Sequence, residues 1–173
     1  MFWASLRPLL EGNPEALARL DAIREGFAEA MAQELDAMWA SKLGLVRYDA
    51  ALVQELLQLM VASKADVTIF FRRLSEIPEQ VSALQESFYV PCSEELDAQW
   101  TSWLQRWRQQ VMSSGDPRET AAAMQRVNPS ITWREWLIAP AYEQAAQGDY
   151  GLVRELQEVF RHPYDALPAE LAA

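Results

Sequence analysis

The chain has 173 residues, half of them hydrophobic, and its 25 acidic and 15 basic side chains give a formal net charge of −10. A chain of this length and apolar content can bury a core of its own, so we expect one helical domain over residues 1–165 and a flexible tail over 166–173. Nucleic-acid binding needs concentrated positive charge, which this evenly spread acidic composition lacks, and we predict no nucleic-acid partner.

The chain contains one cysteine, Cys92, and one histidine, His162. They can form neither an internal disulfide nor a zinc site with four protein ligands, so we predict no metal site and a cytoplasmic location. The apolar N-terminus is interrupted by Arg7 and Pro8 and does not match a signal peptide. No run reaches the ~18 apolar residues of a membrane span, and we predict no membrane association.

Helical spacing dominates the first part of the chain. Asn13 is a suitable N-cap, and Pro14 suits the first helical position of a long amphipathic helix over 14–41. Gly44 is placed to end this helix in a left-handed conformation. Its apolar residues recur every three or four positions: Leu17, Leu20, Ile23, Phe27, Met31, Leu35 and Met38.

Two shorter helices are predicted next. Asp49 caps the first, and Asp66 caps the second over residues 67–76. The β-branched and aromatic run that follows Asp66 favours a strand locally, but its apolar positions continue a helical spacing. Residues 78–91 predict a short helix and then an irregular connection.

Start and stop signals divide the remainder into further helices. Ser93 starts one that runs to about residue 112, and Asp116-Pro117 starts the next. Asn128-Pro129 repeats this start signal. Pro140 is expected to kink or restart the helix that follows, because proline lacks a backbone N–H.

The last helix is expected between Gly148 and His162. Gly148 stops the helix before it, Asp149 caps it, and His162-Pro163 ends it. The sequence as a whole predicts an all-α fold, a compact array of about seven to nine helices without significant sheet.

Trp100, Trp103 and Trp107 lie at helical spacing, and Leu96, Leu104 and Val111 share their helical face. One interpretation is an aromatic face that binds a protein partner, since tryptophan is enriched at binding sites. The other is a helix face packed into the core, which the leucines on the same face favour. Both interpretations remain open at this point, and the three tryptophans are candidate interface residues.

Catalytic and cofactor-binding motifs are absent from the sequence. It contains neither GxGxxG nor GxxxxGK, the two common phosphate-binding loops, and neither DFG nor HRD. Cys92 precedes a helix start, but a nucleophilic thiol also needs a neighbouring base. We therefore assign no catalytic, cofactor-binding or metal-binding residue.

Three blocks of residues, in this order and spacing, carry a family resemblance. They are Lys42-Leu43-Gly44-Leu45, Asp66 to Leu74, and Met124 to Asp165, the last containing Arg-Val-Asn-Pro and Gly-Asp-Tyr. Together they resemble the C-terminal end of the selenoprotein O family (YdiU-like), whose full-length members are pseudokinase-fold protein adenylyltransferases. The sequence departs from the family pattern at Val67, Trp133 and Glu135, and no cysteine or selenocysteine stands at its end.

The resemblance implies that different parts of the full-length protein bind the nucleotide and support the fold. Full-length members use ATP and Mg²⁺ to transfer AMP to protein Ser, Thr or Tyr hydroxyls, with nucleotide-binding residues upstream of the matched region. It thus implies a helical C-terminal domain that scaffolds the kinase-like lobe, binds no cofactor and is inactive alone. Arg126 and Arg134 are the residues expected to contact that lobe or another protein surface. The alternative is an autonomous interaction module that uses the tryptophan-rich face.

Overall fold

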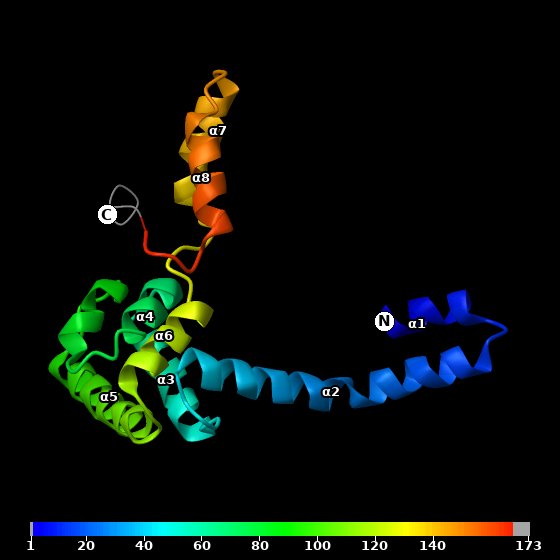
Figure 1. The fold of residues 1–173 in the computed structure, drawn as a ribbon, viewed down its shortest axis with the longest axis horizontal. Coiled ribbons are helices and arrows are strands. Elements are labelled where there is room, and N and C mark those ends of the chain that lie inside the picture. Colours follow the sequence, from blue (N-terminus) through cyan, green and yellow to red (C-terminus); the bar gives the residue numbers. More distant parts are fainter. Residues whose placement is uncertain (1, 168–173) are drawn as a thin grey trace. The chain divides into compact units, whose positions relative to one another are not determined.

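The computed structural model describes residues 2–167, and within that range the chain is built from helices without a sheet, as predicted (Figure 1). It divides into two compact units, residues 1–39 and 40–173, and the single domain over residues 1–165 stays a prediction. Most of the predicted tail, residues 168–173, lies outside the described residues. The elements are α1 Phe2–Leu6, η1 Arg7–Leu10, α2 Pro14–Lys42, α3 Ala50–Ala62, α4 Val67–Leu74, η2 Val81–Ser87, α5 Glu94–Ser113, α6 Pro117–Val127, α7 Glu135–Ala146 and α8 Gly151–Arg161, where η denotes a 3₁₀ helix.

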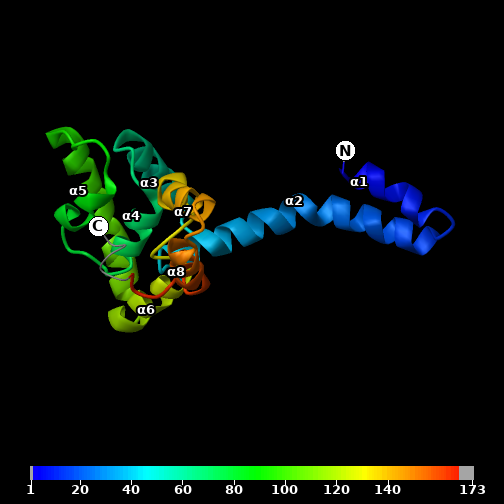
Figure 2. The same ribbon diagram turned by 90° about the horizontal axis from the view of Figure 1, so that it is seen from above.

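The first unit is a hairpin in which α1 and η1 fold back along α2 (Figures 1 and 2). The rings of Trp3 and Phe27 lie 5.8 Å apart edge to face, and Arg7 forms a 2.6 Å ion pair with Asp21. Leu20 is the buried residue of α2. The two N-terminal helices were not predicted, because five and four residues are too few to show a helical period.

The long helix α2 begins as predicted, since Asn13 Oδ1 accepts a hydrogen bond of 3.0 Å from the N–H of Ala16. Its apolar residues, however, are mostly uncovered. The large side chains beyond Leu20 retain 38–52% of their accessible surface: Ile23, Phe27, Met31, Leu35 and Met38. The amphipathic pattern therefore forms the predicted helix without a covering layer over most of its length.

Four predicted N-caps are confirmed in the second unit. Each side-chain oxygen accepts a hydrogen bond from a backbone N–H of the first helical turn, which would otherwise lack a partner. The caps are Asp49 for α3, Asp66 for α4, Ser93 for α5 and Asp116 for α6. Helix α4 forms in spite of its β-branched sequence because the Asp66 cap and the burial of its apolar face outweigh local propensity.

The core of the second unit is aromatic. Trp100, Trp103 and Trp107 of α5 have no accessible surface, and the indole rings of Trp103 and Trp107 stack 6.0 Å apart. Trp103 Nε1 donates to the carbonyl of Leu52 at 2.9 Å, and Trp107 Nε1 donates to the carbonyl of Leu43 at 2.8 Å. The core interpretation is therefore confirmed. As a correction to the candidate interface, these three side chains do not form an exposed docking face.

The Asn128-Pro129 pair does not start a helix, contrary to the prediction. Asn128 is the C-cap of α6, and a non-helical segment separates it from α7. Helix α7 continues through Pro140, so the helix does not restart there, and the alternative of a kink stays a prediction. Helix α8 ends at Arg161 as predicted. Tyr150 occupies its N-cap position, and the side chain of Asp149 accepts a 2.8 Å hydrogen bond from the N–H of Gly151 in the first turn. Helices α7 and α8 pair as a hairpin around a small core of Ile138, Ala141 and Leu156 (Figure 1).

Gly44 ends α2 with a φ of +64°, and a Cβ atom here would lie 2.7 Å from both Met124 Sδ and Thr120 Cγ2. We expect Gly44→Ala to lower the free energy of unfolding by about 2 kcal/mol, through backbone strain and overpacking. Gly148→Ala is the control: its φ is +89° with nothing within 4 Å, so only the backbone cost of about 1 kcal/mol applies. Urea unfolding followed by circular dichroism measures both, and equal losses would contradict the role of the close contact.

Candidate functional site

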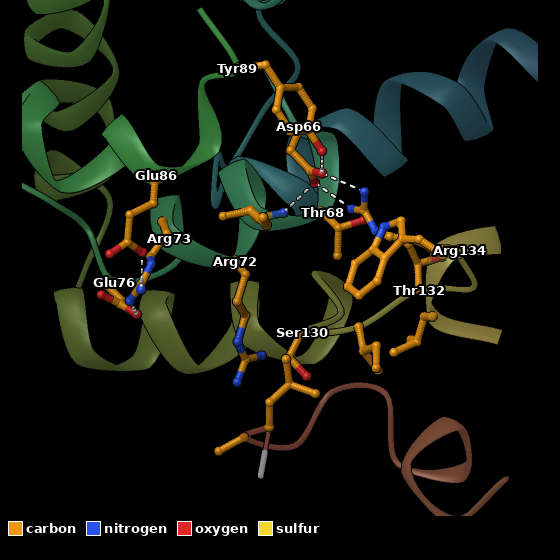
Figure 3. Close-up of a pocket in the computed structure, with 16 residues that line it drawn as sticks. Asp66, Thr68, Arg72, Arg73, Glu76, Glu86, Tyr89, Ser130, Thr132 and Arg134 are labelled. Carbon is orange, nitrogen blue, oxygen red and sulfur yellow. Dashed lines mark hydrogen bonds and ion pairs between the residues drawn. The ribbon is translucent and has the colours of Figure 1, made fainter. Parts of the chain in front are cut away.

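A pocket of the second unit lies beside α4, and its volume is about 590 Å³. One wall is the exposed side of α4, with Thr68 and Arg72. Tyr89, which follows η2, lies at one end, and the segment from Ser130 to Arg134 forms the opposite wall (Figure 3). The pocket thus brings together α4 and the Ser130–Arg134 segment, which are more than 50 residues apart in the sequence.

Asp66 is the centre of the polar contacts in this pocket. Its side chain is 3% exposed, and its two oxygens each lie 2.6 Å from a guanidinium nitrogen of Arg134. Oδ2 also accepts a 2.8 Å hydrogen bond from the hydroxyl of Tyr89, and Oδ1 caps α4 through the N–H of Ile69 at 3.0 Å (Figure 3). A bidentate Arg–carboxylate pair of this kind fixes geometry as well as charge.

These contacts set the protonation of the site. Burial alone would raise the pKa of Asp66, but hydrogen bonds from Arg134, Ile69 and Tyr89 outweigh it and hold the pKa below its ordinary value. The hydrogen bond to Asp66 raises the pKa of the Tyr89 hydroxyl. At neutral pH the carboxyl is therefore ionised and the phenol protonated, which suits a fixed ion pair better than general acid–base catalysis.

The lowered pKa of Asp66 predicts a pH-dependent stability. Because the pKa is depressed in the folded state, the stabilisation is fully present above the ordinary value of 3.8 and is lost as the pH falls below it. Urea unfolding at pH values between 7 and 2.5 measures the effect. The free energy of unfolding should fall less with acid in Asp66→Asn than in the unsubstituted chain, because the variant lacks this carboxyl group. An identical pH profile for the unsubstituted chain and this variant would contradict the prediction.

A second polar cluster, buried behind α4, contains Asn128. Its side-chain oxygen accepts a 2.9 Å hydrogen bond from Lys42 Nζ, and its Nδ2 donates to the carbonyl of Lys42 at 2.8 Å and to Ser75 Oγ at 3.0 Å. Lys42 Nζ also lies 4.6 Å from the centre of the Phe71 ring. Burial lowers the pKa of Lys42. Asn128 therefore joins the ends of α2, α4 and α6.

Arg72 connects the same elements to the segment after α8. Its Nη1 lies within 3.0–3.3 Å of the carbonyl oxygens of Gln125, Asn128 and Tyr164. Ser130 makes a further connection, because its backbone N–H donates to the carbonyl of Pro163 at 2.7 Å. The base of the α7–α8 hairpin is thus tied to α4 and α6 by polar contacts of Arg134, Arg72 and Ser130.

The candidate residues from the sequence are not brought together. Arg134 lies in the pocket and forms an ion pair with Asp66, whereas Arg126 lies exposed near the end of α6. The three tryptophans are in the core, outside the residues that line the pocket. Burial and the charge of Asp97 raise the pKa of Cys92, so its thiol is not activated as a nucleophile.

Asp66, Tyr89 and Asn128 were not predicted as site residues. Asp66 and Asn128 both carried a signal, since each lies in a block of the family resemblance and each was interpreted as a helix cap. A capping signal describes only local contacts, however, and could not indicate partners 53–86 residues away. Tyr89 carried no signal, because it lies in a predicted irregular connection.

Over residues 2–167, no three His, Cys, Asp or Glu side chains are grouped so that they could hold a metal ion. Within the same described part of the chain, no helix combines the length and apolar character needed to cross a bilayer.

Comparison with known proteins gives a consistent result. A family model described as protein adenylyltransferase SelO matches residues 1–161. The chain is 38% identical to the protein nucleotidyltransferase YdiU of Tolumonas auensis over 151 residues, which cover 81% of this chain and 28% of that protein. It is 36% identical to the protein of the same name from Rhizobium etli over 172 residues, or 95% of this chain and 33% of that protein. The chain therefore spans about a third of the length of these curated relatives.

Proposed function

This chain belongs to the SelO family of protein adenylyltransferases, and we propose that it is the helical C-terminal region that scaffolds the nucleotide-binding part of such an enzyme. In this proposal the complete protein transfers AMP from ATP, with Mg²⁺, to hydroxyls of protein substrates. The region described here contributes no catalytic group and works in the cytoplasm.

The proposal is supported by the polar residues in the blocks that resemble the family. Their side chains form hydrogen bonds and ion pairs within the second unit. Asn128 is bonded to Lys42 and Ser75, Arg134 is paired with Asp66, and Arg72 binds backbone carbonyls. Side chains engaged in this way stabilise a particular arrangement of helices and are not available to bind phosphate. They support a scaffolding role.

The sequence supports the same division of labour. Transfer of AMP requires a site for the phosphates of ATP, which proteins commonly build from a glycine-rich loop or a helix N-terminus with a lysine. Neither common loop occurs in the 173 residues, which contain six glycines in total. The alternative of an interaction module with a tryptophan face is not favoured, because Trp100, Trp103 and Trp107 are buried.

Calorimetric titration of the isolated chain with ATP and Mg²⁺ tests the proposal. We expect no heat of binding at concentrations where the full-length Tolumonas auensis relative, as the positive control, binds nucleotide. The same pair of proteins should differ in the transfer of labelled AMP to protein. Micromolar affinity of the isolated chain for ATP, or AMP transfer by it, would refute the scaffolding proposal.

A further inference from the structure

The apolar stripe of α2 is left mostly uncovered by the contacts described above. We use the term α2 stripe for the five side chains Ile23, Phe27, Met31, Leu35 and Met38, each 38–52% exposed. At 1.5 Å rise per residue they extend over about 22 Å of helix. Exposed hydrophobic residues scattered singly are normal, but a contiguous row of this length marks an interaction surface.

Acidic residues occupy the side of α2 opposite to the α2 stripe. Glu25, Glu29 and Asp36 lie on the side of α2 opposite to Met31 and are exposed. A helix that is fully solvated has no need of an apolar face, whereas a helix that packs on one side does. The large apolar side chains of α2 thus gather on one side of the helix, which also carries Arg24 and Glu34.

The hairpin of the first unit covers only the beginning of this side. Leu20 is buried there, and Trp3 contacts Phe27, yet Phe27 keeps 49% of its surface. The stripe continues with Met31, Leu35 and Met38 beyond the contact with Trp3. An additional apolar surface is needed to cover this second half.

The comparisons indicate where that surface comes from. The SelO family model matches residues 1–161, and the match to the Rhizobium etli relative covers 95% of this chain, so α2 and its stripe belong to the shared region. The chain covers 33% of that relative, which therefore has twice as much further sequence available to pack on the helix.

We propose that the α2 stripe is the surface on which the nucleotide-binding part of the family protein docks. This inference rests on the function proposed above and names the contact through which the scaffold acts. The partner surface is apolar at its centre. It carries an acidic group facing Arg24 and a basic group facing Glu34, since both of these charged residues lie on the α2 stripe side of the helix.

The test uses a charge-neutral double substitution that preserves helix propensity. Met31→Glu with Leu35→Lys places a favourable i,i+4 pair in the middle of the α2 stripe. Ala18→Glu with Ala22→Lys places the same pair on the exposed side of α2 opposite to the stripe and is the matched control. In the isolated chain, both doubles should retain the helix content and the urea midpoint of the unsubstituted protein.

The docking itself is measured in a full-length chimera, in which this chain replaces the matching segment of the Rhizobium etli relative. We expect the Met31→Glu/Leu35→Lys chimera to lose at least tenfold in AMP transfer and to unfold in two separate urea transitions. The control double should resemble the unsubstituted chimera in both measurements. A single transition and full activity in the Met31→Glu/Leu35→Lys chimera would overturn the docking inference and leave the proposed function standing.

Two other outcomes separate the proposals. If the unsubstituted chimera transfers no AMP, the proposed function fails, and the number of urea transitions still decides whether the α2 stripe docks. If light scattering shows that the isolated chain dimerises and that Met31→Glu/Leu35→Lys abolishes the dimer, the α2 stripe joins two copies. That result would overturn docking on the nucleotide-binding part.

Discussion

Trp103→Ala is expected to lower the free energy of unfolding by about 3–5 kcal/mol, the usual cost of removing a buried tryptophan side chain from a core. Trp103 has no accessible surface, and its ring stacks on Trp107. The substitution also removes the hydrogen bond to the carbonyl of Leu52, which then lies buried with one partner fewer. Urea unfolding followed by far-ultraviolet circular dichroism measures the loss.

Trp133→Ala is the matched control for this experiment. Trp133 is 65% exposed, and a surface substitution of this kind usually changes stability by less than about 0.5 kcal/mol. Trp103→Ala is therefore expected to lower the free energy of unfolding much more than Trp133→Ala does. Comparable losses for Trp103→Ala and Trp133→Ala would contradict the assignment of α5 to the core.

Asn128→Ala is expected to cost about 3 kcal/mol, because a buried side chain with several hydrogen-bond partners leaves each of them unsatisfied when it is removed. Asn128 has no accessible surface and bonds to both Lys42 and Ser75. The half-buried Lys42 ammonium loses its acceptor, and burial already disfavours its charged form. The free energy of unfolding at pH 7 is the measurement.

The other asparagine of the chain, Asn13, provides the control. Asn13 also precedes a proline, but its side chain only caps the exposed start of α2, so Asn13→Ala should cost about 1 kcal/mol. If the two alanine variants were equally stable, Asn128 would be acting as an ordinary cap. The network that joins α2, α4 and α6 would then contribute little to stability.

Local signals predicted the helices well because their causes are local. Asp49 and Asp66 cap helices through N–H groups three residues away, and the same holds for Ser93. Such contacts can be inferred from a few neighbouring residues. The family resemblance likewise followed from the order of motifs along the chain, and the match to residues 1–161 confirms it.

The candidate site was less predictable because its contacts are distant in sequence. Arg134 was selected as a residue that contacts a partner, but its guanidinium pairs with Asp66, 68 residues away. The burial of Trp103 and the exposure of Trp133 could not both follow from spacing, since each tryptophan has another three or four residues away. Burial depends on what packs against a helix, which the period of that helix does not specify.

The two asparagine–proline pairs show most directly what local sequence can predict and what depends on tertiary contacts. By itself the sequence determined an all-α chain of capped helices, the SelO family and the absence of the common phosphate-binding loops. Only the tertiary structure decided that Asn13-Pro14 starts a helix while Asn128-Pro129 follows the end of one. The physical reason is that the Asn128 side chain finds better partners across the core, in Lys42 and Ser75, than in the backbone beside it.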